Sequence, residues 1–290
     1  MPFSTQNGAS IYFETMGSPT DQPLVFIEGL SAQMIGWREP FCHAFVDRGF
    51  WVIRLDNRDV GLSQKFGGPD DFDGDYDMSD MANDTFGVLD TLGLKSAHVV
   101  GQSMGGMIAQ TMAITDPGRV RSMTLFYTAP SSGPYVGDDL TEHVSRQRET
   151  NPHGPRDQII EKMVESQRFC ASTAYPFDEA WIRELAGLRY DRCHCPEGPL
   201  RQYAAALRAP DRLPALHALA TPAAIIHGRA DRLIKLEAAL DMARALRNSE
   251  LHVFPGLGHE IARPLWEEFT RIIERTARRA SSPNSRNQSE

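Results

Sequence analysis

The chain has 290 residues, of which 41% are hydrophobic, which is enough for one large α/β domain or two small ones. Its 30 basic and 38 acidic residues give a net charge of −8 without a basic cluster, so nucleic acid is not expected as a partner. No apolar run approaches the roughly 20 residues of a membrane span, so none is predicted.

The amino-terminal residues and the cysteines bear on the cellular compartment. Residues 1–8 contain neither a basic segment nor an apolar segment of a secretory signal. The four cysteines, at positions 42, 170, 193 and 195, show no spacing typical of a disulfide framework. We therefore expect a cytoplasmic protein with reduced thiols. The sequence leaves open whether the chain forms a homo-oligomer.

Strands and helices alternate in the first part of the chain. Apolar runs predict an early edge strand at 11–14 and buried strands at 24–27, 51–55, 97–100 and 123–127. Helices are predicted at 39–47, 78–92 and 104–114, and the second has apolar residues at i, i+3 and i+4 spacing. Apolar strands separated by helices are typical of a mostly parallel central sheet that is flanked by helices.

The pattern changes at residue 130 and returns after residue 213. The intervening segment is polar, helix-rich and dotted with aromatic residues, which predicts a helical cap inserted over the strand ends. Strands at 223–226 and 251–254 and helices at 236–246 and 264–275 then follow. We predict an α/β core in two parts, 1–129 and 214–278, a helical cap at 130–213, and a disordered polar tail at 279–290.

A Gly-x-Ser-x-Gly motif centred on Ser103 lies between a predicted strand and a predicted helix. A serine on such a sharp turn is exposed at the carboxyl edge of the sheet, and glycines two positions before and after it avoid collision with the backbone. This context favours a catalytic nucleophile over the alternative of a serine that only caps the following helix.

A nucleophilic serine needs an imidazole base and an acid that orients the base. Among the nine histidines, His259 follows the last strand through a glycine-containing loop and is expected to open the final helix. Asp231 lies just beyond the carboxyl end of another strand. The order Ser103, Asp231, His259 is the order expected for this motif. The alternatives are a histidine and an aspartate that cap helices.

Two backbone amides are predicted to form the oxyanion hole. One belongs to Met104, directly after the nucleophile. The other is assigned to Leu30, because Gly29 lets the turn after the strand at 24–27 bend inward. No cofactor or metal is predicted. The acidic segment at 71–77 imitates a calcium loop, but Tyr76 and Ala82 stand where glycine and glutamate are needed.

With these partners placed, residues 8–275 resemble the α/β-hydrolase fold superfamily. The resemblance is carried by segments 28–30, 55–63, 100–107, 226–231 and 258–259. Segments 190–192 and 198–202 and the pair Gly36-Trp37 are similar to aclacinomycin methylesterase-like hydrolases. The chain departs from the common pattern at Glu28, where members often carry histidine. We expect the Glu28 side chain to point away from the oxyanion and to brace the turn.

The resemblance implies a cofactor-free serine hydrolase that cleaves a carboxylic ester of a small, largely apolar substrate. C–C bond hydrolysis, lactone opening and perhydrolysis use the same triad and remain alternatives. An alternative from another class is a ligand receptor that kept the fold and lost turnover.

Overall fold

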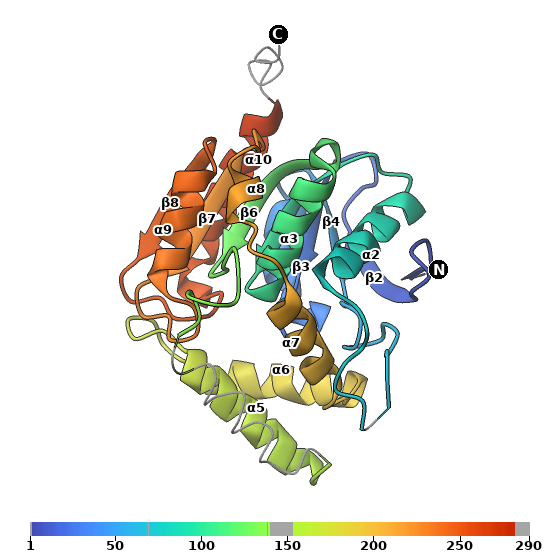
Figure 1. Cartoon of the computed structure of the whole chain (residues 1–290). Helices are drawn as coiled ribbons and strands as arrows, with labels where there is room; N and C mark the ends of the chain where they lie inside the picture. The colour runs from blue at the N-terminus through green and yellow to red at the C-terminus, as the bar shows by residue number, and fades with distance from the viewer. Residues whose placement is uncertain (1, 69, 138, 140–152, 282–290) are drawn as a thin grey trace.

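The centre of the structure is an eight-stranded sheet (Figure 1). The computed structural model describes residues 2–68, 70–137, 139 and 153–281. The strand order is β1-β2-β4-β3-β5-β6-β7-β8, and only β1 and β2 run antiparallel to their neighbours. The strands are β1 (Phe3–Ser4), β2 (Ile11–Met16), β3 (Gln22–Ile27), β4 (Phe50–Leu55), β5 (Ala97–Gln102), β6 (Val120–Phe126), β7 (Ala223–Gly228) and β8 (Ser249–Phe254).

The predicted parallel sheet follows from strands that are buried on both faces. All six residues of β4 and of β7 are buried, which is why their sequences are mainly apolar rather than alternating, with Arg54 and His227 as the polar exceptions. The prediction of 11–14 as an edge strand was wrong in one respect, because the short strand β1 pairs outside β2. Two residues are too few to give a periodic signal.

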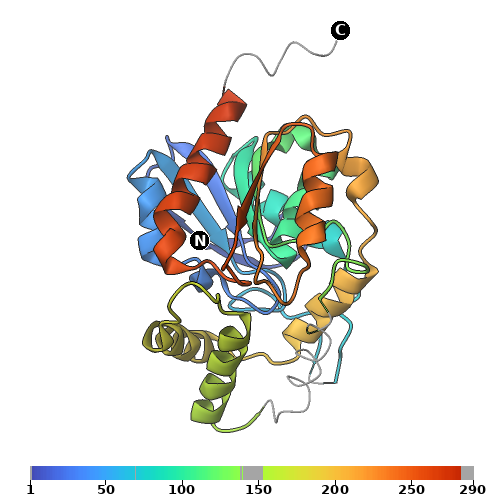
Figure 2. The ribbon, with the colours of Figure 1, turned by 90° about the vertical axis from the view of Figure 1, so that its left-hand side faces the viewer.

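Helices cover both faces of the sheet (Figures 1 and 2). One layer contains α2 (Met78–Thr91), α3 (Met104–Thr115), α8 (Leu213–Leu216) and α9 (Leu236–Ala245). The other contains α1 (Glu39–Val46) and α10 (Trp266–Ser281). Each layer has its own apolar core. Ile108 and Met112 belong to the first, and Phe41, Phe45 and Phe269 belong to the second.

Three further helices lie beyond the carboxyl ends of the strands, at the bottom of Figure 1. They are α5 (Arg156–Cys170), α6 (Glu179–Arg192) and α7 (Gly198–Arg208), within the segment for which a helical cap was predicted. Ile160 and Val164 of α5 pack with Ala186 of α6 in a small core of their own. We refer to α5, α6 and α7 as the cap helices.

The predicted limits of the last helix were wrong at both ends. A short 3-10 helix, η3 (Arg263–Leu265), takes up the proline, and α10 starts only at Trp266. The helix continues to Ser281, into the segment predicted as a tail, and the remainder of that segment lies outside the described residues.

Two other 3-10 helices are η1 (Met34–Gly36) and η2 (Pro117–Arg119). Within the described ranges, no helix has both the length and the apolar character that crossing a membrane requires.

Candidate active site

Ser103 occupies the sharp turn between β5 and α3. Its φ of 51° and ψ of −119° are unfavourable for a residue with a side chain, so the surrounding packing must hold it. A Cβ on Gly101 would lie 2.2 Å from the carbonyl oxygen of Gly105, and one on Gly105 would lie 2.3 Å from that of Ile27. Both glycines are therefore required by backbone contact, as the motif predicts.

Asp231 and His259 are joined by a direct hydrogen bond. Asp231 Oδ2 accepts it from His259 Nδ1 at 2.8 Å, and Oδ1 accepts from the amides of Leu233 and Ile234. Burial alone would raise the pKa of Asp231, but the charge and hydrogen bond of His259 hold that pKa below its usual value. Asp231 can therefore fix the ring orientation of His259 and leave Nε2 for a proton on the substrate side.

His259 lies in a loop, so the prediction that it opens the last helix was wrong. Its amide donates to the carbonyl of Cys170 at 2.8 Å, and the amides of Thr173 and Ala174 bond to Gly256 in the same loop. These bonds tie the loop to the end of α5 and to the segment that follows it. The loop continues until η3 begins at Arg263.

A second histidine lies on the other side of Asp231. His227 in β7 is buried, with Nε2 3.7 Å from Asp231 Oδ2 and 3.0 Å from the carbonyl oxygen of Ile234. Burial lowers the pKa of His227, which favours the neutral ring donating to that carbonyl. This arrangement gives His227 a structural role beside Asp231.

Ser103 and His259 line one cavity of about 280 Å³. Its walls also include apolar side chains from the core and the cap helices, among them Met107, Phe41, Trp181, Leu185 and Trp266. Within the described part of the chain, no hydrogen bond joins the Ser103 hydroxyl to the His259 imidazole. Such bonds are often long in ligand-free sites and shorten when substrate binds.

The two amides predicted for the oxyanion hole belong to residues of this cavity. Leu30 and Met104 both line it, and neither amide donates to another described residue. The turn lies against the nucleophile, because a Cβ on Gly29 would be 3.2 Å from the Cβ of Ser103. The amides are thus free to bind an oxygen of a ligand.

Glu28 is fully buried beside this turn and also lines the cavity. Its carboxylate accepts hydrogen bonds from the amide of Gly29 at 3.3 Å and from the side-chain amide of Gln102. One carboxylate oxygen, Oε1, has no partner among the described residues. Burial raises the pKa of Glu28 to about 7, against the opposing effects of Arg189 and these hydrogen bonds. Glu28 therefore braces the turn through its bond with the Gly29 amide, as expected, but its carboxyl group also forms part of the cavity wall.

The same network reaches the proposed base. The Tyr127 hydroxyl donates to the side-chain oxygen of Gln102, and the Tyr127 ring lies 4.4 Å from that of His259, centroid to centroid. The sequence motifs do not single out these two residues, because Gln102 fills an unspecified position of the Gly-x-Ser-x-Gly pattern and Tyr127, directly after β6, belongs to no motif. Their proximity depends on the neighbouring positions of β3, β5 and β6 in the sheet.

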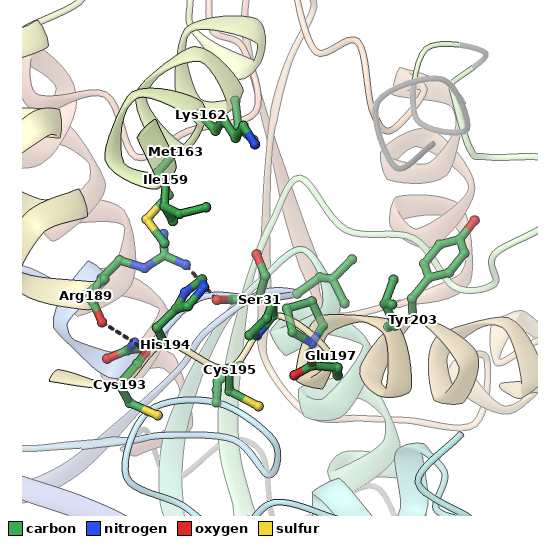
Figure 3. A pocket seen from close by; sticks show the side chains of 18 of the residues that line it. Ser31, Ile159, Lys162, Met163, Arg189, Cys193, His194, Cys195, Glu197 and Tyr203 are labelled. Carbon is green, nitrogen blue, oxygen red and sulfur yellow. Dashed lines mark hydrogen bonds between the residues drawn. The ribbon is translucent and has the colours of Figure 1, made fainter. Parts of the chain in front are cut away.

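A second cavity, of about 690 Å³, opens between the cap helices and the core (Figure 3). It includes Cys193, His194 and Cys195, and no group of metal-binding side chains was found among the described residues. The two cavities share part of their walls: Leu30, Ser31, Ser166, Gln167, Arg189 and Tyr203. Arg189 bonds to the Ser31 carbonyl at this boundary, so a ligand in one cavity meets residues of the other.

Three features of the structure define a hydrolase of the α/β class. They are the mostly parallel sheet, the strained serine at the strand-to-helix turn, and the histidine–aspartate pair at the same edge of the sheet. A family model described as alpha/beta hydrolase fold matches residues 22–262, and the chain belongs to that family.

Similar proteins include several hydrolases. The chain is 24% identical to rhodomycin D methylesterase of Streptomyces sp. (strain C5), over 93% of this chain and 95% of that protein. It is 33% identical to 2-hydroxymuconate semialdehyde hydrolase of Pseudomonas sp. (strain CF600), over 89% and 84%. The crystal structure of the enol-lactonase from Burkholderia xenovorans LB400 superposes with a TM-score of 0.76 at 21% identity, over 95% and 99%, and shares the fold.

Proposed function

We propose that the protein hydrolyses a carboxylic ester through Ser103, His259 and Asp231. The observation that carries the proposal is the 2.8 Å hydrogen bond between Asp231 and His259, at the cavity that Ser103 also lines. A carboxylate-oriented imidazole beside a strained serine is the arrangement that makes a hydroxyl nucleophilic.

The reaction starts when Ser103 Oγ attacks the ester carbonyl carbon and His259 Nε2 accepts the hydroxyl proton. The amides of Leu30 and Met104 donate to the oxyanion of the tetrahedral intermediate, and Asp231 stabilises the imidazolium. The intermediate collapses, and the leaving alcohol takes the proton from His259 while the acyl group stays on Ser103. Water then attacks the acyl-enzyme and gives a proton to His259. His259 passes this proton to the oxygen of Ser103 as the carboxylic acid leaves, which restores the free serine.

Two observations support a substrate with a small, largely apolar reacting part. The 280 Å³ cavity has mainly apolar walls. Two of the relatives that align with 93% of this chain are named rhodomycin D methylesterases, which favours a methyl ester. A second candidate is hydrolysis of a C–C bond, because the relative at 33% identity is named a 2-hydroxymuconate semialdehyde hydrolase.

Substrate profiling with a nucleophile variant tests the proposal. Purified wild type and Ser103→Ala are compared on panels of methyl esters, short acyl esters and β-diketones, and products are identified by mass spectrometry. We expect ester turnover that Ser103→Ala abolishes, and labelling of Ser103 by a fluorophosphonate. Turnover of diketones alone would favour the C–C reaction, and labelling without any turnover would favour a receptor.

A further inference from the structure

We propose that Gln202, in cap helix α7, is a positioning residue that holds the oxyanion turn in its working conformation. The cap would then complete the reactive site as well as cover it. This inference rests on the proposed hydrolase function, and it concerns how the second oxyanion donor is held in place.

Gln202 joins the oxyanion turn to a neighbouring loop of the core. The side chain is fully buried, its oxygen accepts from the Ser31 amide at 2.9 Å, and its NH₂ group donates to the Arg58 carbonyl at 2.8 Å. An amide N–H can only donate and a carbonyl can only accept, so these partners fix which way the glutamine amide points. A rotation of the side chain would break both bonds and leave buried polar groups unpaired.

Ser31 needs such support because its backbone is strained. Its φ is 66°, in the left-handed region that is unfavourable for a residue with a side chain. Arg189 of α6 donates to the Ser31 carbonyl at 2.6 Å, so side chains of two cap helices hold both backbone polar groups of this residue. Relaxation of Ser31 would move Leu30, the neighbouring residue whose amide is assigned to the oxyanion.

Two adjacent residues of α7 have different roles: one docks the helix on the core, and the other supports the oxyanion turn. Arg201 pairs with Asp59 at 2.8 Å, and both side chains are buried, so this pair docks the helix on the core. Arg208 of α7 also forms an ion pair with Asp73, an exposed residue of the core that lines neither cavity. Neither Arg201 nor Asp73 has a hydrogen bond to the oxyanion turn. Gln202 does, so a loss specific to Gln202 can be separated from poorer docking of the cap.

The test compares Gln202→Met, which keeps the side-chain length, with Asp73→Ala, which removes one ion pair between α7 and the core. For each variant, kcat and KM are measured on an ester that wild type cleaves. We also measure binding of a trifluoromethyl ketone, which forms an oxyanion on Ser103, and of the matching secondary alcohol, which does not. Circular dichroism and thermal unfolding check that the variants are folded.

We expect Gln202→Met to lower kcat by about 10- to 100-fold with little change in KM, because a misplaced donor loses part of its effect. The inhibition constant of the ketone should rise by a similar factor, while binding of the alcohol should stay the same. Asp73→Ala should match wild type in all four measurements. An unchanged kcat, or equal weakening of ketone and alcohol, would overturn the inference.

A second variant covers the case in which Gln202→Met does not fold. In Gln202→Glu, a protonated carboxyl can replace both hydrogen bonds, whereas the ionised form repels the Arg58 carbonyl. The kcat of this variant relative to wild type should therefore rise toward one as the pH is lowered, and a pH-independent ratio would contradict the inference. Failure of the proposed function would look different, because wild-type turnover would then survive Ser103→Ala.

Discussion

Glu28 accepts a hydrogen bond from the side chain of Gln102, the residue directly before the proposed nucleophile. The bond places a buried carboxyl group beside the turn that carries one of the two oxyanion amides. A negative charge there opposes the developing oxyanion, while a neutral carboxyl does not. The protonation state of Glu28 should therefore affect catalysis.

The first prediction is a loss of activity on the alkaline side. Because burial raises the pKa of Glu28 to about 7, the group is neutral below that pH and charged above it. The kcat of wild type should fall as the pH rises through about 7, and Glu28→Gln should remove this fall. Steady-state kinetics across the pH range provide the check, with exposed Glu184→Gln as the control. An alkaline loss that persists in Glu28→Gln would exclude this role.

The same carboxyl should also affect stability, which is the second prediction. Its pKa is higher in the folded chain than the ordinary value of 4.5, so its contribution to the free energy of unfolding is complete below that value and is lost as pH rises through about 7. The free energy of unfolding of Glu28→Gln, relative to that of wild type, should therefore rise by about 2 kcal/mol when the pH is raised from about 5 to about 8. Urea unfolding at both pH values measures this, and a constant difference would contradict the prediction.

The sequence predicted every strand of the sheet except β1, and it indicated candidate site residues that follow the ends of strands. Apolar runs and the Gly-x-Ser-x-Gly pattern are local signals, and they are sufficient to indicate Ser103, Asp231 and His259 as candidates. Contacts such as Ser31 with Gln202 join positions 171 apart in the chain. They depend on how the cap docks, which no local periodicity encodes.

Glu28 illustrates a second limit of sequence analysis. The departure from the common histidine was visible in the sequence, and a bracing role for Glu28 in the turn was expected. The link to Tyr127 through Gln102 was not, because it requires β3, β5 and β6 to be adjacent in the sheet. Strand adjacency in a parallel sheet is a tertiary property. Motifs at the ends of single strands therefore indicate candidate site residues, but they do not indicate the hydrogen bonds that join these residues across the sheet.

The third prediction concerns the tight turn that holds Ser103. In Gly101→Ala the new methyl group would lie 2.2 Å from the Gly105 carbonyl oxygen, which the backbone of α3 cannot relieve without moving. We expect loss of nearly all activity and a destabilisation of about 3 kcal/mol or less, typical of overpacking. Gly133→Ala is the matched control, since nothing lies within 4 Å of its Cβ position. Thermal unfolding and ester turnover of the two variants test this, and equal behaviour would refute it.

The fourth prediction tests the orientation of the proposed base. Asp231→Asn keeps the shape of the side chain but removes the charge, and an amide NH₂ facing His259 Nδ1 favours the wrong tautomer. Comparable changes in serine hydrolases lower kcat by about 10⁴-fold, and we expect a loss of about 10³- to 10⁴-fold with KM nearly unchanged. The control is Asp157→Asn, whose side chain is 96% exposed. Single-turnover kinetics with an activated ester should locate the loss in acylation. A loss confined to KM would mean that Asp231 shapes the binding site and does not orient the base.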